Sequence, residues 1–231
     1  MGIMTKKLFG GLLFVLLSGY AFMFLPHFFY DDIWGDDPDE PYIAIKGRKP
    51  VDATAKAWGA FWVTGDECES YSYDLFGRKA HRGGKVDRKY TQDFSSDPNF
   101  YELRIPYKSV VDNNHCIIEL RDISVSFEND FSGFGLLRIY QPMEHIYKYA
   151  LPTGSVLEAK DCNADLLLDT DGSWLGRNRC VHYVNGKKNG GSNPENVNFD
   201  FTKFSGDTVI RYDVYAGKHY RSEPLDPVAG P

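Results

Sequence analysis

The stretch that decides the fold is Cys162-Asn-Ala-Asp-Leu-Leu-Leu-Asp-Thr-Asp-Gly-Ser-Trp-Leu-Gly-Arg-Asn-Arg-Cys180. If its two cysteines face each other across an antiparallel pair, the chain turns at residue 171 and Asp169 pairs with Ser173. The loop is then Thr170-Asp171-Gly172, and a three-residue hairpin loop needs a left-handed last residue, which glycine adopts without strain. The stretch therefore predicts a β-hairpin closed at its base by a disulfide.

The Asp-Thr-Asp-Gly part of this stretch also resembles the start of a calcium-binding loop. Such a loop needs a bidentate glutamate at its twelfth position. A loop that begins at Asp169 reaches Cys180 there, and one that begins at Asp165 reaches Gly176. Neither start provides the required glutamate, so the hairpin is the better interpretation of this stretch.

The cysteines predict two disulfides. The chain has four, at Cys68, Cys116, Cys162 and Cys180, and none forms a Cys-x-x-Cys pair. An even number of cysteines in an exported chain is typical of disulfides, whereas zinc sites need closely spaced ligand pairs. Because the hairpin pairs Cys162 with Cys180, Cys68 is left for Cys116. The six histidines are scattered, and we predict no metal or other cofactor.

The hydrophobic pattern outside this stretch is also that of strands. Apolar residues alternate with polar ones from Tyr101 to Tyr107 and from Ile210 to Val214, which is the period of a half-buried strand. Further strand candidates are 43–45, 57–63, 70–73, 135–140, 155–159, 180–184 and 197–201. We expect an all-β domain, either a β-sandwich or a partly closed barrel of about eight to ten short antiparallel strands.

One strand candidate, Cys116–Phe127, changes phase. The apolar residues are at the even positions 118 and 120 in its first half and at the odd positions 123, 125 and 127 in its second half. A slip of one residue near Arg121 and Asp122 predicts a β-bulge or a strand that changes the face it buries.

The N-terminus predicts a membrane anchor. Lys6 and Lys7 precede an apolar run that extends, with its flanking residues, over 8–30. This length suffices to cross a bilayer, and positive residues stay on the cytoplasmic side. We expect a single-pass protein of the inner (cytoplasmic) membrane with its C-terminal domain in the periplasm or otherwise outside the cytosol. The alternative is secretion after signal cleavage near Ala21.

This topology divides the chain into five parts. Residues 1–7 form a short cytoplasmic tail, 8–30 a transmembrane signal anchor, and 31–41 an acidic linker rich in Asp, Gly and Pro. The extracytoplasmic β domain is expected over 42–223, followed by a flexible C-terminal tail over 224–231.

The best candidate for a binding surface is a basic stretch in this otherwise acidic chain. The chain has a net charge of -6, which disfavours nucleic acid as a partner. Two central glycines predict a loop over 76–90 whose cations would attract an acidic partner, although a solvated loop that balances acidic neighbours has the same composition. The six cations are Arg78, Lys79, Arg82, Lys85, Arg88 and Lys89.

Two tryptophans, Trp58 and Trp62, have equal parity and would share one face of a strand. They would suit either a wall of the core or an aromatic platform, and the core is the expected place.

The function that these features favour is protein binding. No Gly-x-Ser-x-Gly elbow or phosphate-binding loop is present, so a binding protein is favoured over an enzyme. We expect a membrane-anchored module that binds an extracytoplasmic protein, of an immunity type or an envelope assembly type. The alternatives are an envelope hydrolase that acts on glycans or lipids with acid/base carboxylates and, third, a carbohydrate-binding module.

Overall fold

The computed structural model describes residues 40–65, 68, 71–73, 79–81, 84–111, 115–142 and 149–228. The predicted cytoplasmic tail, the transmembrane segment and nearly all of the acidic linker lie outside the described residues.

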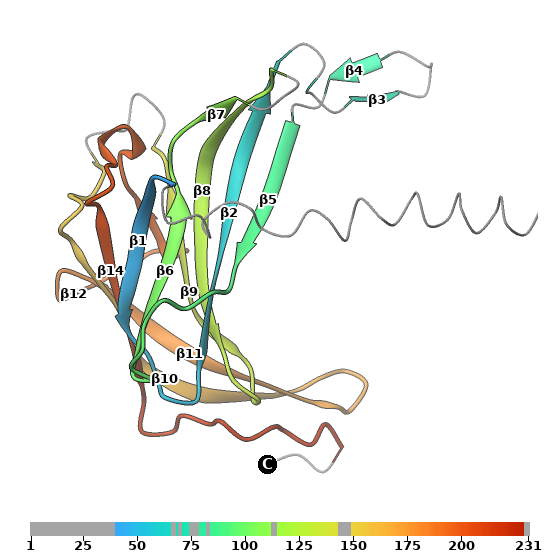
Figure 1. The fold of residues 1–231 in the computed structure, drawn as a ribbon. Helices are drawn as coiled ribbons and strands as arrows, with labels where there is room; N and C mark the ends of the chain where they lie inside the picture. The colour runs from blue at the N-terminus through green and yellow to red at the C-terminus, as the bar shows by residue number, and fades with distance from the viewer. Residues whose placement is uncertain are drawn as a thin grey trace, which may run out of the picture.

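Most of the described residues belong to two β-sheets (Figure 1). Sheet A has the order β12 (Lys187–Lys188), β11 (Trp174–Val184), β10 (Val156–Leu168), β14 (Val209–Ala216), β1 (Tyr42–Arg48) and β6 (Phe100–Pro106). Sheet B has the order β13 (Asn196–Asn198), β9 (Gly133–Tyr140), β8 (Ile117–Glu128), β2 (Thr54–Thr64) and β5 (Gly84–Tyr90), and β7 (Val110–Val111) also pairs with β8. A separate small sheet joins β3 (Tyr71–Tyr73) to β4 (Lys79–His81), and the described helix is one 3-10 turn, η2 (Phe201–Lys203).

The all-β prediction is confirmed, but the expectation of purely antiparallel strands is wrong. Strand β14 runs parallel to both of its neighbours, β1 and β10, and β13 runs parallel to β9. Parallel neighbours need long connections between them, which the chain supplies because β14 follows β1 and β10 only after many intervening residues. Alternating hydrophobicity shows that a segment is a strand and does not show its neighbours. The described part of the chain also has more strands than expected, because five of the fourteen span only two or three residues.

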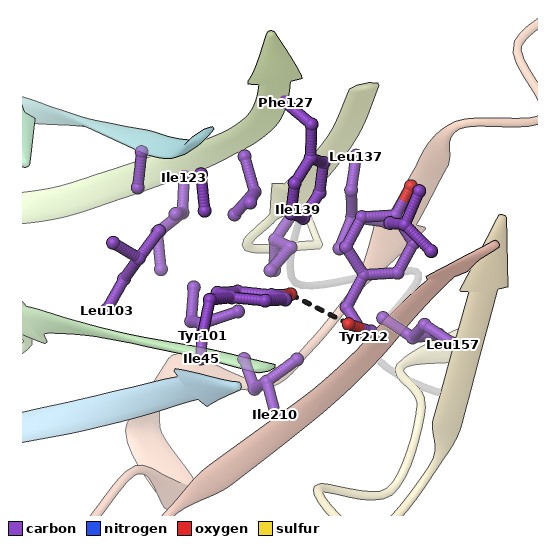
Figure 2. Packing of buried hydrophobic residues seen from close by; sticks show 14 of the residues in the cluster. Ile45, Tyr101, Leu103, Ile123, Phe127, Leu137, Ile139, Leu157, Ile210 and Tyr212 are labelled. Carbon is purple, nitrogen blue, oxygen red and sulfur yellow. Dashed lines mark hydrogen bonds between the residues drawn. The ribbon is translucent and has the colours of Figure 1, made fainter. Parts of the chain in front are cut away.

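The two sheets face each other across one core. The buried cluster draws Ile43 and Ile45 from sheet A and Ile123 and Val125 from sheet B. Figure 2 shows its centre, where side chains from both sheets interdigitate.

Two buried tyrosines link the sheets at this centre. The Tyr101 hydroxyl donates to the Tyr212 carbonyl oxygen at 2.8 Å (Figure 2). The Tyr212 hydroxyl donates to the Gly135 carbonyl oxygen of sheet B at 2.9 Å. The Tyr101 ring also packs edge-on against Phe127, with 5.0 Å between the ring centroids. Burial raises the pKa of both hydroxyls, which therefore remain neutral donors.

Gly47 allows a close approach between β1 and β14. The parallel pairing of these strands ends at Lys46 and Arg211. A Cβ atom on Gly47 would overlap the Tyr212 carbonyl, which accepts the hydrogen bond from the Tyr101 hydroxyl. Beyond this point the Arg48 amide donates to the Asp213 carboxylate at 2.8 Å, so a side chain replaces the missing ladder bond.

The predicted hairpin is confirmed down to its loop. Leu168 pairs with Trp174, the Asp169 amide donates to the Ser173 carbonyl at 2.8 Å, and Gly172 has a φ of 85°. The structure adds an irregularity between Lys160 and Asn163, at the base of the hairpin, that the sequence did not predict. Both disulfides join the predicted cysteines, Cys68 with Cys116 and Cys162 with Cys180.

Strand β8 has a β-bulge where the phase slip predicted one. Asp122 pairs with Ala60 and Leu120 with Phe61, so Arg121 has no opposite residue in β2. The bulge keeps apolar residues on both sides of it directed to the core, because Leu120 packs against the core and Ile123 lies inside it.

Candidate binding surface

Strand β5 contains the second half of the predicted basic loop. The loop prediction is wrong for Gly84–Tyr90, which pairs along its length with β2. The strand is hard to recognise because its outward positions are all charged, while Val86 and Tyr90 on the other face carry the apolar signal. Gly84 begins the strand, where a Cβ atom would lie 2.7 Å from the carbonyl oxygen of Val63.

The six predicted cations do not form one group. Lys85 and Lys89 are exposed on the outer face of sheet B, whereas Arg88 has the opposite parity and is less exposed. Lys79 lies in β4, and Arg78 and Arg82 lie outside the described residues. The structure therefore brings together Lys85 and Lys89.

Trp58 and Trp62 lie beside these two lysines. Trp58 pairs with Lys89 and Trp62 with Lys85 across β2 and β5. The two tryptophans share a face, as predicted, but that face is the outer one. Trp58 is 36% exposed and Trp62 is 43% exposed, so the expected place in the core is wrong. The buried positions of β2 on the other face are Ala55 and Ala57 at its start and Phe61 and Val63 towards its end.

Each tryptophan ring has a cation against it. The Lys89 Nζ atom lies 5.9 Å from the ring centroid of Trp58, and the Arg121 Cζ atom lies 4.4 Å from that of Trp62. Arg121 is the bulge residue of β8. Cation–π contacts of this kind fix the orientation of both partners. We call the group Trp58, Trp62, Lys85, Lys89 and Arg121 the tryptophan face.

Two carboxylates lie next to the tryptophan face. Asp87 contacts Lys85, with 3.0 Å between Oδ1 and Nζ, and Asp122 contacts Arg121, with 3.3 Å between Oδ2 and Nε. Partial burial raises the pKa of Asp122, and the neighbouring Arg121 and Lys85 oppose this rise. A third carboxylate, Glu119, lies opposite Trp62 in β8, so the three cations of the face have three acids beside them.

A cavity of about 600 Å³ lies between β9 of sheet B and β11 of sheet A. Its polar lining comes from Arg177, Arg179, His182, Ser192 and Glu195. Both arginines contact the Asp165 carboxylate, with Nε to Oδ2 distances of 3.6 and 3.3 Å. One acid therefore contacts two of the cations that line the cavity.

Burial in this region lowers the pKa of His182, and the nearby Glu195 carboxylate partly opposes the shift. The unfolded chain then binds a proton more readily than the folded chain once the pH falls below the ordinary pKa of 6.5. The stability contributed by neutral His182 is present above that pH and is lost as the pH falls.

We expect the free energy of unfolding to fall between about pH 7.5 and pH 5.5, and to fall less in the His182→Gln variant. Urea unfolding at both pH values measures this difference. An equal fall in the variant and the unmodified protein would show that His182 is not the group that titrates.

A second cavity, of about 380 Å³, lies on the outer face of sheet A. It is lined by residues of β6, β1 and β14, together with Ser95 from the segment before β6. Its charged residues are Lys46, Glu102, Arg211 and Asp213.

No family model matches the chain, and neither a curated protein nor a solved structure matches it. Within the described ranges, no group of three or more His, Cys, Asp or Glu side chains is placed to hold a metal ion. The same part of the chain has no helix of the length and apolarity that a membrane crossing requires.

Proposed function

We propose that the chain is a membrane-tethered β-sandwich domain that acts outside the cytosol and binds another protein through the tryptophan face. The observation that carries this proposal is the pair of large aromatic side chains, Trp58 and Trp62, exposed on the outer face of sheet B with a cation against each ring. Tryptophan and arginine are enriched among the residues that contribute most to protein interfaces.

The backbone beneath the tryptophan face favours tight binding. Strand β2 pairs with β8 on one side and with β5 on the other, so both tryptophans rise from a strand that is held at both edges. A rigid surface loses little conformational entropy when a partner binds. Its exposed lysines, Lys85 and Lys89, would attract acidic residues of the partner and speed their encounter.

The proposed location agrees with the disulfides. Two disulfides are compatible with an oxidising compartment outside the cytosol. A predicted anchor over 8–30 would concentrate the domain at the membrane, where an immunity-type or envelope assembly partner would meet it.

A photo-crosslinking residue in place of Ser124, which lies opposite Trp58 on the same outer face, tests this proposal with the full chain in the native membranes. We expect a defined protein adduct, and we expect the double variant Lys85→Glu and Lys89→Glu to reduce its yield by roughly fivefold or more. The matched control is Lys187→Glu with Lys188→Glu, which makes the same charge change on the exposed strand β12 of sheet A.

Absence of any adduct at position 124 would contradict the proposal. An equal loss of adduct in the control would also contradict it, because net charge would then explain the effect without the tryptophan face.

A carbohydrate-binding module is the second candidate, favoured by the same two exposed tryptophans, since sugars stack on aromatic rings. Protein binding is preferred because a ring face of each tryptophan is already in contact with a cation, which a sugar would have to displace. Saturable quenching of tryptophan fluorescence by an oligosaccharide, lost in the Trp62→Ala variant, would support the carbohydrate candidate instead.

The hydrolase alternative has less support. In the cavity on sheet A, Glu102 contacts Arg104 and Asp213 contacts Arg211, each through the arginine Nε. Both acids are thus engaged in positioning an arginine, which favours binding over acid/base chemistry at this site.

A further inference from the structure

Two cations face each other in the cavity on the outer face of sheet A. Lys46 of β1 and Arg211 of β14 are direct partners in the parallel register, and both line the cavity. Their side chains are 48% and 56% exposed. Like charges directly opposite each other on neighbouring strands are destabilising. Such a pair suits a site where an anion binds between the two side chains.

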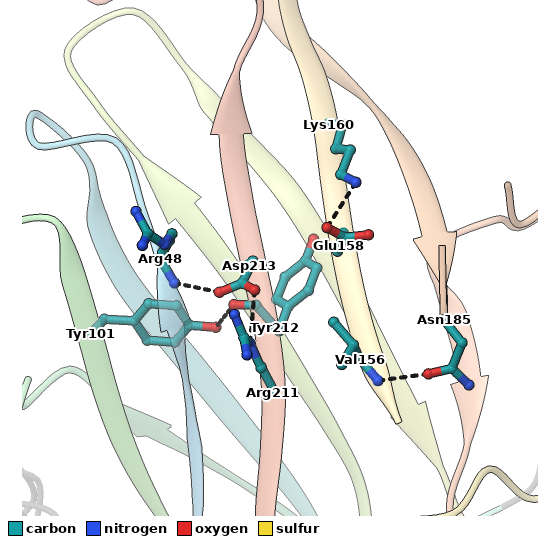
Figure 3. A network of polar contacts seen from close by, with 9 residues as sticks. All are labelled: Arg48, Tyr101, Val156, Glu158, Lys160, Asn185, Arg211, Tyr212 and Asp213. Atoms are coloured by element: carbon teal, nitrogen blue, oxygen red, sulfur yellow. Dashed lines mark hydrogen bonds and ion pairs between the residues drawn. The ribbon is translucent and has the colours of Figure 1, made fainter. Parts of the chain in front are cut away.

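Neighbouring acids orient the two cations without covering them. The Asp213 carboxylate, which is 2% exposed, accepts two hydrogen bonds, one from the Arg211 Nε at 2.9 Å and one from the Arg48 amide at 2.8 Å (Figure 3). The guanidinium is thus held from one side, and among the described residues this is its one hydrogen bond. Its two terminal nitrogens remain available for a forked contact with a carboxylate.

The Lys46 ammonium group is held more loosely. The nearest contact is with Glu102, whose Oε2 lies 4.0 Å from Nζ, beyond hydrogen-bond distance. The other oxygen of Glu102 accepts the Nε of Arg104 at 3.1 Å. Glu102 is therefore engaged by Arg104, and Lys46 can donate to a ligand.

The cavity also has an apolar wall. Phe100 and Val209 line it, and they are 36% and 37% exposed. The Arg48 guanidinium lies 5.0 Å from the Phe100 ring centroid and holds the ring in place. The volume of about 380 Å³ lies in the range of small-molecule sites.

We propose that this cavity binds a small organic carboxylate, with its carboxylate between Lys46 and Arg211 and its ring-sized body against Phe100 and Val209. An aromatic acid and a uronic acid sugar share this chemistry. The site goes beyond the proposed function, because it lies on the outer face of sheet A, whereas the tryptophan face lies on the outer face of sheet B.

Isothermal titration of the full chain in detergent tests the site with two matched pairs of probes. Phenylacetate is compared with 2-phenylethanol, and glucuronate with glucose, so that each pair differs in the carboxylate. We expect at least one acid to bind roughly tenfold or more tightly than its neutral counterpart, because a charge-assisted hydrogen bond contributes that much. Which of the two acids binds shows whether the apolar wall of the cavity accepts an aromatic ring or a sugar ring.

The variant Lys46→Gln removes one cation with little effect on the fold, because the side chain is about half exposed. We expect it to weaken binding of the acid by roughly tenfold. The control is Lys187→Gln on β12, which makes the same change on the same sheet outside the cavity lining. The proposal is overturned if neither acid binds, if each acid binds no better than its neutral counterpart, or if the two variants have the same effect.

Discussion

Replacing Gly47 with alanine is expected to lower the free energy of unfolding by about 3 kcal/mol or more. The added Cβ atom would overlap the Tyr212 carbonyl, and backbone cannot move aside as the end of a flexible side chain can. The strands β1 and β14 would have to separate at the point where the Tyr101 hydroxyl donates to that carbonyl. The substitution therefore disturbs the pairing and the core at once.

Urea unfolding followed by circular dichroism measures this loss. The matched control is Gly154→Ala, because a Cβ atom at Gly154 meets nothing within 4 Å. We expect the control to change the free energy of unfolding by less than about 0.5 kcal/mol. A Gly47→Ala protein as stable as the control would show that the close approach of β1 and β14 is wrong.

Truncating Tyr212 should have a comparably large effect. Tyr212→Ala opens a cavity in the centre of the core and is expected to cost about 3–5 kcal/mol. Tyr212→Phe keeps the ring but leaves the Gly135 carbonyl without its hydroxyl donor. A buried acceptor that loses its partner costs about 1–3 kcal/mol.

The same unfolding measurement separates packing from hydrogen bonding at this residue. The control is Tyr215→Phe, which removes a hydroxyl from the same strand β14 at a position that is not fully buried. We expect a change within about 0.5 kcal/mol for the control. If Tyr212→Phe cost no more than Tyr215→Phe, the hydrogen bond between the sheets would contribute nothing to stability.

The sequence predicted those parts of the fold that depend on local pattern. The spacing of Cys162 and Cys180 around Gly172 specified the register of a hairpin, because an antiparallel pair has one centre and glycine relieves the strain at its last loop residue. The phase slip at Arg121 located a bulge, because strand side chains alternate strictly between the two faces and an extra residue shifts that alternation by one.

Features that depend on neighbours in space could not be predicted. The two central glycines predict a loop where strand β5 lies. Its outward residues Lys85, Asp87 and Lys89 are all charged, as is common on an edge strand, and they hide the apolar alternation. Trp58 and Trp62 were expected in the core because parity groups residues on a face without showing which face is buried. The available signal was the other parity of β2, where Ala55, Ala57, Phe61 and Val63 form an uninterrupted apolar face.

The cavity on sheet A was missed for a different reason. Lys46 and Arg211 are far apart in the sequence and meet only because β14 lies beside β1. The alternation around Ile210 predicted that Arg211 points away from the core, but no local pattern connects it to Lys46. The site could therefore not be predicted, because it depends on parallel pairing between segments that are distant in the sequence.

The position of β14 also determines when the domain can fold. This strand comes last in the sequence, yet it joins the half of sheet A that contains β1 and β6 to the half that contains β10, β11 and β12. During synthesis the two halves have no common neighbour until residues 209–216 emerge. Pairings between such distant segments close slowly, because the intervening chain must first lose its conformational freedom. Sheet A is thus expected to be completed only after β14 is available, whereas the described strands of sheet B all precede β14 in the sequence.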